Sequence, residues 1–349
     1  MADLLFLRES PLSAWRMDLD RILIRAPNWV GDCVMAMPAV QRIRERFTKA
    51  HIALLAKTKV LDVWRNNPHL DEVLPHTDLG LLPEKKFDLA ILFPNSFRSA
   101  WEAYRAGIPR RVGYSGHWRR WLLTDVVPGN WHRPTETHFV HHYLKIGKHL
   151  DASDAPCPPR IVLLPGELDE ADRLLGATEG PLCAMAPGAE YGPAKRWLPE
   201  RFVQVAKQTD CTWVIVGGPH DAEVCNPIAD ALGPKAINLV GKTTLRQLCA
   251  LLARCRVLLS NDSGAMHVGS AVGTRVVAVF GSTEPAATGP VGDAHATIRH
   301  KVDCSPCFLR ECPIDFRCMK RIEVSEVARA VARGLETHRS ERSESVDGE

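Results

Sequence analysis

The chain has 349 residues, of which 45% are hydrophobic and 24% are charged, and its formal net charge at pH 7 is +3. The composition is that of a globular protein, and the length corresponds to about two domains of roughly 150 residues each. So small a net charge argues against a nucleic-acid-binding protein, so we expect no nucleic-acid partner, and any charged partner must meet a local patch.

The ends of the chain carry no signal for export. Residues 1–17 hold one short apolar run, Leu4–Leu7, which is too short for the core of a secretory signal. No segment approaches the roughly 18 apolar residues of a membrane-spanning helix. We therefore expect a cytoplasmic protein whose eleven cysteines stay reduced. Residues 1–19 are expected to be an N-terminal extension and residues 336–349, which are polar and charged, a disordered tail.

In the first half, short Leu- and Ile-rich runs alternate with amphipathic stretches. We predict strands over Arg21–Ala26, His51–Ala56 and Phe87–Phe93, with a helix over Cys33–Phe47. This rhythm is typical of a parallel sheet. It pauses over Asp151–Gly180, where proline is frequent, and we place the domain boundary there, with domains over residues 20–165 and 166–335.

The second half repeats the rhythm. The predicted strands are Leu182–Ala186, Thr212–Val216, Val257–Leu259 and Arg275–Phe280, and the predicted helices are Gln204–Asp210, Leu245–Arg254 and Val324–Leu335. The expected fold class is therefore α/β, with two Rossmann-like parallel-sheet domains facing each other across a cleft. Ligands of such sheets bind at the carboxyl ends of the strands.

The most informative motif lies at the end of the strand that begins at Val257. Asn261 and Asp262 end the apolar run, and Ser263 and Gly264 open a helix. The bare N–H groups and positive dipole of a helix N-terminus attract anions, and Gly264 has no side chain to keep a pyrophosphate from the backbone. Asp262 would project into the same crevice. The alternative is that Ser263 is no more than an N-cap.

Two further loops bring unusual chemistry to the cleft. Asp32 follows Gly31 near the start of the first helix; it either projects into the cleft or merely complements the helix dipole. Residues 187–197 are too rich in glycine and proline for a helix, and they deliver Lys195 as a point charge suited to a phosphate. A lone lysine in a loop is more often solvated. The expected proximity of Asp262 and Gly264 is what favours Lys195 as a phosphate-binding residue.

Five motifs, in order, resemble those of the bacterial lipopolysaccharide heptosyltransferases, and most those of the heptosyltransferase II group: RAPNWVGDCVMAMPA from Arg25, PNSFRSAW from Pro94, AGIPRRVGY from Ala106, APGAEYGPAKRW from Ala186 and SNDSGAMHV from Ser260. The resemblance implies a GT-B-like fold that binds the acceptor in the first domain and the nucleotide-sugar in the second. It implies inverting transfer of heptose from ADP-heptose to the first inner-core heptose of Kdo2-lipid A. A sister enzyme that serves another core position is the alternative.

The resemblance also implies roles for individual residues. The catalytic residues are Asp32, as general base, and Lys195, which stabilises the leaving diphosphate. No metal or other cofactor is then required. The implied donor-binding residues are Gly188, Glu190, Lys195, Glu223, Gly241, Thr243, Asp262, Ser263, Gly264 and His267. The implied acceptor-binding residues are Asn28, Trp29, Gly31, Asn95, Arg98, Arg119 and Arg120. His267 is alternatively a satisfied helix histidine, and Glu223 a solvated helix residue.

The stretch Pro94–Leu150 is basic and contains tryptophans. Lys and Arg outnumber Asp and Glu there, and Trp101, Trp118, Trp121 and Trp131 are interleaved. Arginines suit the phosphates and carboxylates of an inner-core saccharide, and tryptophans suit sugar rings and the membrane interface. We expect a peripheral contact with the inner leaflet of the cytoplasmic membrane, and a monomer. The alternative is a solvated basic face with core tryptophans.

The transferase interpretation leaves the cluster Cys304, Cys307, Cys312 and Cys318 unexplained. It is either a structural metal site or a set of free thiols, and its spacing fits neither a zinc ribbon nor the usual ferredoxin run. Two other functions compete with the transferase. The chain lacks the G-x-G-x-x-G that an NAD-dependent oxidoreductase would carry after its first strand. Its low net charge argues against a non-catalytic binding module.

Overall fold

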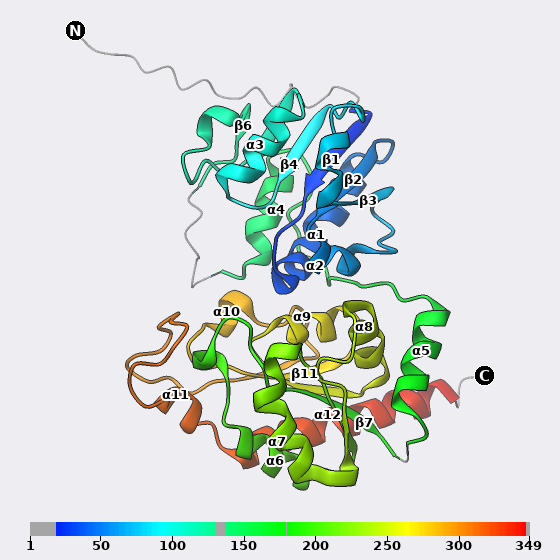
Figure 1. Ribbon diagram of the computed structural model, residues 1–349, viewed down its shortest axis with the longest axis vertical. Helices are drawn as coiled ribbons and strands as arrows, with labels where there is room; N and C mark the ends of the chain where they lie inside the picture. Colours follow the sequence, from blue (N-terminus) through cyan, green and yellow to red (C-terminus); the bar gives the residue numbers. More distant parts are fainter. Residues whose placement is uncertain (1–18, 130–136, 179, 347–349) are drawn as a thin grey trace.

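The computed structural model describes residues 19–129, 137–178 and 180–346, and side chains only up to residue 336. The predicted N-terminal extension before Leu19 and Trp131 lie outside the described residues. Within them the chain forms two lobes, stacked along the long axis (Figure 1), each built on a six-stranded sheet. The described strands pair in parallel throughout. The predicted fold class is confirmed.

The first lobe contains the strand order β3-β2-β1-β4-β5-β6. Its strands are β1 (Arg21–Arg25), β2 (His51–Ala56), β3 (Glu72–Pro75), β4 (Leu89–Leu92), β5 (Arg110–Gly113) and β6 (Asp125–Val126). Its helices are α1 (Val30–Arg46), α2 (Thr58–Leu61), α3 (Phe97–Arg105) and α4 (Val140–Lys148), with 3-10 turns η2 (Asp62–Trp64), η3 (His76–Leu81) and η4 (Arg120–Leu122). The order reverses direction between β1 and β4, which makes a crevice at their carboxyl ends.

The second lobe has the order β12-β11-β10-β7-β8-β9. Its strands are β7 (Leu182–Ala186), β8 (Thr212–Ile215), β9 (Ala236–Asn238), β10 (Val257–Asn261), β11 (Arg275–Val279) and β12 (Ala296–Ile298). Its helices are α5 (Pro165–Leu175), α6 (Pro199–Lys207), α7 (Ala222–Leu232), α8 (Leu245–Arg254), α9 (Gly264–Ala271), α10 (Pro285–Thr288), α11 (Arg317–Lys320) and α12 (Val324–Val346), with η5 (Pro193–Lys195), η6 (Pro219–Asp221) and η7 (Gly233–Lys235). The equivalent crevice lies between β7 and β10.

Both faces of each sheet are covered by helices. On β1, Ile22 and Ile24 face the core under α1 and α4, whereas Leu23 faces the core under α3. On β7, Ala184 packs toward α8 and α9, while Met185 packs toward α6, α7 and α12. Successive strand residues point to opposite faces. Two covered faces therefore explain why the strands read as continuous apolar runs.

The lobes meet through apolar side chains and backbone hydrogen bonds. One hydrophobic cluster runs from α1 and α4 into α8 and α9, and so belongs to both lobes. The amide of Phe139 donates to the Ala287 carbonyl at 2.8 Å, and His138 Nε2 lies 2.9 Å from the Gly289 carbonyl oxygen. These contacts fix the two crevices opposite each other. Residues 151–164, between the sheets, form neither helix nor strand; the precise domain limits at 165 and 166 stay a prediction.

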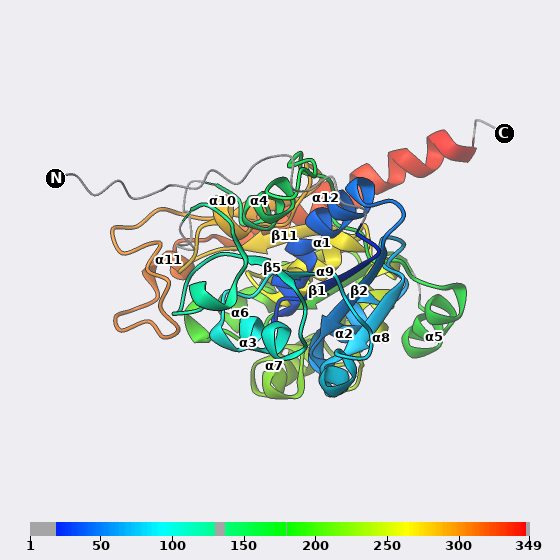
Figure 2. The ribbon, with the colours of Figure 1, turned by 90° about the horizontal axis from the view of Figure 1, so that it is seen from above.

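The C-terminal helix differs from its prediction. α12 continues past Leu335 to Val346, so the structure has a helix where we expected a disordered tail from residue 336. Its end projects beyond the body of the molecule (Figure 2). The reason is compositional, because arginine and glutamate in this stretch have good helix propensity. Among the described helices, none has the length and apolar character needed to cross a membrane.

Candidate active site

A cavity of about 490 Å³ opens where the two crevices face each other. This volume is within the range of small-molecule sites. The predicted site residues that line it are Trp29, Gly31, Asp32, Gly188, Glu190, Lys195, Thr243, Asp262, Ser263, Gly264 and His267. They come from both lobes. The structure therefore brings together the proposed base and most of the proposed donor-binding residues.

Two helix N-termini, those of α1 and α9, approach each other in this cavity. A Cβ on Gly31 would lie 2.7 Å from His267 Cδ2, and one on Gly264 would lie 3.3 Å from Val30 Cβ. Gly31 is thus part of the first turn of α1 and makes room for the His267 ring. The positive ends of both helix dipoles lie at the cavity.

Ser263 is the N-cap residue of α9, as the alternative interpretation of this serine predicted. Its side chain, however, accepts no hydrogen bond from the helix. Its hydroxyl instead lies 3.1 Å from Ser260 Oγ. A helix without a side-chain cap leaves its first N–H groups to other acceptors. The start of α9 therefore has the chemistry of an anion site.

Lys195 and Asp262 form a nearly buried ion pair. Lys195 Nζ lies 2.6 Å from Asp262 Oδ2, and the two side chains are 15% and 5% exposed. The Thr283 hydroxyl donates to the same oxygen at 2.7 Å. Asn261, just before, holds the Lys195 loop, since its Nδ2 donates to the Pro187 carbonyl at 2.6 Å and its Oδ1 accepts from the Trp197 amide at 2.9 Å. Lys195 is thus positioned by β10 rather than solvated.

Asp32 lies in the first turn of α1, half-buried, and lines the cavity. A carboxylate at this place is stabilised by the helix dipole, as the structural alternative proposed. Asp32 also lines the same cavity as Asp262 and Lys195. The two interpretations are compatible, because a dipole that stabilises the anion does not remove it from the cavity.

At the rim, Lys59 links the lobes. Its Nζ lies 3.7 Å from Glu190 Oε1 and 4.0 Å from the centre of the Trp29 ring. All three side chains are well exposed, and an exposed ion pair contributes at most about 1 kcal/mol. Glu190 and Trp29 therefore sit where the cavity opens to solvent.

The cavity is also lined by Thr243, Thr244, Leu245, Leu248 and a second-lobe carboxylate, Asp221. A Cβ on Gly188 would lie 2.1 Å from Asp221 Oδ1, so glycine is needed there.

Glu223 is exposed on α7 and does not line the cavity. The structure therefore does not bring it together with the donor-binding set, because it lies on the solvent side of its helix. Gly241 is also outside the lining; its φ of +68° and its approach to Pro219 give it a role in the turn.

His267 is 4% exposed and stands on α9 against Gly31. Burial lowers the pKa of its imidazole from 6.5 to about 4, more than Asp262 raises it. Among the described residues, its Nδ1 has no hydrogen-bond partner. His267 is therefore neutral at pH 7 and is not the satisfied histidine of the alternative interpretation.

Four of the predicted acceptor-binding residues differ in how far they are exposed. Arg98 and Arg120 are exposed, Asn28 is half-buried and Asn95 is buried. Neither polar atom of the Asn95 side chain has a partner within the described part of the chain. These four residues lie outside the cavity lining, at the carboxyl-end side of the first sheet.

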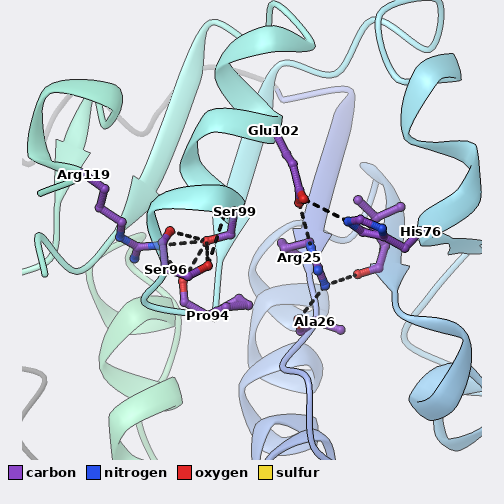
Figure 3. A network of polar contacts seen from close by, with 9 residues as sticks. Arg25, Ala26, His76, Pro94, Ser96, Ser99, Glu102 and Arg119 are labelled. Atoms are coloured by element: carbon purple, nitrogen blue, oxygen red, sulfur yellow. Dashed lines mark hydrogen bonds and ion pairs between the residues drawn. The ribbon is translucent and has the colours of Figure 1, made fainter. Parts of the chain in front are cut away.

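Arg119 does not fit the acceptor-binding group. It is fully buried, and its guanidinium donates to the Tyr114 carbonyl at 2.7 Å. It also donates to Ser99 Oγ at 3.0 Å and to the Pro94 carbonyl (Figure 3). Burial lowers its pKa to about 10, so it stays charged at pH 7. The prediction that Arg119 contacts the acceptor is corrected. Arg119 instead stabilises the loop after β4 through hydrogen bonds from its buried guanidinium.

A second buried arginine lies at the start of the loop between β1 and α1, the helix that carries Asp32. Arg25, at the end of β1, donates to the Ala26 carbonyl at 2.9 Å and to the Leu55 carbonyl at 3.3 Å. Its Nε lies 3.3 Å from Glu102 Oε2, and the other oxygen of Glu102 lies 2.9 Å from His76 Nε2 (Figure 3). No motif in the sequence predicted this network.

Exposed aromatic side chains gather on α3 and η4. We call Phe97, Trp101, Tyr104 and Trp121 the aromatic patch; they are 42%, 38%, 47% and 64% exposed. Trp101 and Trp121 lie with their ring centroids 6.5 Å apart, and each lies 5.7 to 6.4 Å from the rings of Phe97 and Tyr104. These tryptophans are therefore surface residues and not core residues.

The cysteine cluster shows no metal-binding geometry. Within residues 19–129, 137–178 and 180–346, no group of three or more His, Cys, Asp or Glu side chains lies close enough to hold a metal ion. Cys304 is exposed, Cys307 and Cys312 are half-buried, and Cys318 is buried. The four residues are free thiols in this structure.

The site also contains Tyr191, Asp221 and Thr283, which were not predicted. Tyr191 and Asp221 line the cavity, and Thr283 bonds to Asp262. Tyr191 is inside a motif that we quoted, and Asp221 follows a Gly-Gly-Pro step, so both carried a signal of position. Thr283 carried none, because its contact depends on how β11 lies beside β10.

Comparisons with known proteins identify the family. A model of glycosyltransferase family 9 (heptosyltransferase) matches residues 81–316. The chain is 33% identical over 314 residues to lipopolysaccharide heptosyltransferase 2 of Escherichia coli K12, covering 81% of this chain and 90% of that protein. It is 30% identical over 312 residues to lipooligosaccharide heptosyltransferase 2 of Haemophilus ducreyi, covering 80% and 88%.

The solved structure of E. coli ADP-heptose lps heptosyltransferase II matches with a TM-score of 0.79 at 29% identity, over 91% of this chain and 99% of that one. The predicted resemblance and the GT-B-like fold are confirmed, and the oxidoreductase and non-catalytic alternatives are rejected. The chain belongs to glycosyltransferase family 9, the heptosyltransferases.

Proposed function

We propose that this enzyme transfers heptose from ADP-heptose to the first inner-core heptose of Kdo2-lipid A, with inversion at the anomeric carbon. The names of the relatives support the donor and the lipopolysaccharide acceptor. The observation that carries the mechanism is that Asp32, from one lobe, and Lys195 with the start of α9, from the other, line one cavity.

In this proposal the second lobe binds the donor. The N–H groups at Ser263 and Gly264 and the ammonium of Lys195 hold the two phosphates. A lysine ammonium has three donors; one contacts Asp262, which leaves two for phosphate oxygens. Asp262 and the neutral His267 contact heptose hydroxyls. Asp221, another carboxylate of the cavity lining, binds the ribose hydroxyls.

The reaction then needs one base and one stabilised leaving group. Asp32 takes the proton of the acceptor hydroxyl as its oxygen attacks the anomeric carbon, and the bond from that carbon to the ADP oxygen breaks. Negative charge grows on the diphosphate, where Lys195 and the α9 dipole stabilise it. Because attack and departure occur on opposite faces, the configuration inverts. This chemistry assigns no step to a metal.

The aromatic patch supports the proposed peripheral contact with the inner leaflet. Arg98 and Arg105 on α3 and Arg120 on η4 are all exposed, and the one acid on α3, Glu102, is buried and paired. Amphipathic aromatic rings beside arginines suit the interface of an anionic membrane. Figure 1 places α3 on the first lobe, away from the second.

Sedimentation with phosphatidylglycerol vesicles tests this contact. The double variant Trp101→Ala, Trp121→Ala should lose most vesicle binding. Leu309→Ala, which removes an exposed apolar residue of the second lobe, should not. Equal binding by the unchanged protein and both variants would refute the contact.

The monomeric state of the protein remains a prediction.

A mass-spectrometric assay tests the transfer. Purified protein is given ADP-heptose with either Kdo2-lipid A or the same molecule already carrying one heptose. The proposal predicts a gain of one heptose on the second acceptor alone. A gain on the bare acceptor would assign the chain to a sister enzyme for the first heptose, and a gain on neither would refute the donor and acceptor.

A further inference from the structure

The cysteine-bearing segment that the mechanism does not use contacts two loops of the cavity at once. We call residues 304–310 the bridge segment. One of the loops carries Lys195, and the other, residues 281–284, carries Thr283. Both of these side chains bond to Asp262 Oδ2. The bridge segment therefore contacts both of the loops whose side chains bond to Asp262.

The first set of contacts joins the bridge segment to the Thr283 loop. The Phe308 amide donates to the Ser282 carbonyl at 2.8 Å, and Ser305 Oγ donates to the Gly281 carbonyl at 2.6 Å. These bonds fix the backbone on either side of the residue that precedes Thr283.

The second set joins the bridge segment to the Lys195 loop. The Tyr191 hydroxyl donates to the Phe308 carbonyl at 2.9 Å, Arg310 Nε donates to the Tyr191 carbonyl at 2.7 Å, and the Ala194 amide donates to the Arg310 carbonyl at 3.0 Å. A Cβ on Gly192 would lie 2.4 Å from that same Arg310 oxygen. The two backbones thus approach as closely as glycine allows.

We propose that the bridge segment is a positioning element of the donor site, with Arg310 and Tyr191 as its positioning residues. The inference rests on the proposed function of Lys195. The Lys195 loop has only the short turn η5 as regular structure, so its shape depends on contacts from outside the loop. The bridge segment supplies them, and the Tyr191 ring that it holds lies 5.0 Å from Lys195 Nζ. Ordering the loop in advance lowers the entropy that donor binding must offset.

Titration of the purified enzyme with ADP tests the proposal. Arg310→Ala removes the bond to the Tyr191 carbonyl, and Tyr191→Phe removes only the hydroxyl that bonds to Phe308. Each should raise the Kd for ADP about threefold to tenfold, the effect of one net hydrogen bond. KM for the donor should rise by the same factor while kcat changes less than twofold. Arg317→Ala is the matched control, because Arg317 pairs with Asp315 on the exposed surface.

The outcomes separate positioning from mere stability. A lower melting temperature with unchanged ADP affinity in Arg310→Ala and Tyr191→Phe would overturn the proposal. So would an equal loss of affinity in Arg317→Ala. If the unchanged enzyme binds ADP through Lys195 but both bridge variants bind it equally well, this inference alone fails. If the unchanged enzyme does not bind ADP, or Lys195→Met binds it normally, the proposed donor site fails as well.

Discussion

The buried pair of Lys195 and Asp262 gives the sharpest quantitative prediction. In Lys195→Met the side chain keeps its length and loses its charge. Asp262, which is 5% exposed, then keeps the Thr283 hydroxyl as a partner at 2.7 Å but loses its counter-charge. The variant therefore leaves a carboxylate buried without a cation.

Removal of one partner from a buried ion pair costs about 3–5 kcal/mol. Lys195 is 15% exposed at its side chain, so water reaches it and we take the lower end, about 3 kcal/mol. In the double variant Lys195→Met, Asp262→Asn, no uncompensated charge remains, and most of this loss should return. ADP affinity should fall about 10- to 100-fold in both proteins, because a charge-assisted contact to phosphate contributes about 1.5–3 kcal/mol.

Urea unfolding of the three proteins measures the stability term, and calorimetric titration with ADP measures the binding term. The account predicts that adding Asp262→Asn to Lys195→Met restores the free energy of unfolding but does not restore the affinity for ADP. Unchanged unfolding free energy in Lys195→Met would refute the buried pair. Recovery of ADP affinity in the double variant would refute direct contact between Lys195 and phosphate.

Three other predictions follow from the same geometry. Gly31→Ala should lower turnover at least tenfold, because its methyl meets His267 at 2.7 Å, whereas Gly147→Ala, with an ordinary contact of 3.6 Å, should leave turnover unchanged; equal rates would contradict the close approach. Arg119→Met should lower the free energy of unfolding by about 3 kcal/mol, while the exposed neighbour Arg120→Met should mainly raise KM for the acceptor, and the reverse pattern would refute our assignment. Unfolded His267 takes up a proton below its ordinary pKa of 6.5, whereas folded His267 does so only near 4, so the free energy of unfolding should fall as the pH falls below 6.5. The variant His267→Gln should remove about 2 kcal/mol of that fall between pH 7 and pH 5. Urea unfolding measures it, and an unchanged pH profile in the variant would contradict the neutral buried ring.

The sequence predicted the fold where a strand was long and apolar. β2 (His51–Ala56) and α8 (Leu245–Arg254) have the predicted bounds. The strands that went unpredicted, such as β5 (Arg110–Gly113) and β6 (Asp125–Val126), are short and polar and lie at or near a sheet edge. Their pairing comes from tertiary context rather than from local preference.

The site was predictable where it sits on a strand-to-helix turn. Asp32 and Asp262 both lie at the carboxyl ends of strands beside the point where the sheet order reverses, which the sequence pattern already indicated. Arg119 and Arg120 show the limit of that reasoning. They are neighbours of the same type, and only the fold makes one fully buried and the other exposed.

The most direct test of the mechanism is the rate of heptosyl transfer by Asp32→Asn under saturating ADP-heptose and heptosylated Kdo2-lipid A, measured by mass spectrometry with donor affinity determined in parallel. The account predicts that transfer slows by about two to four orders of magnitude, with the Kd for ADP-heptose unchanged within about twofold. Transfer at the rate of the unchanged enzyme would contradict Asp32 as the general base.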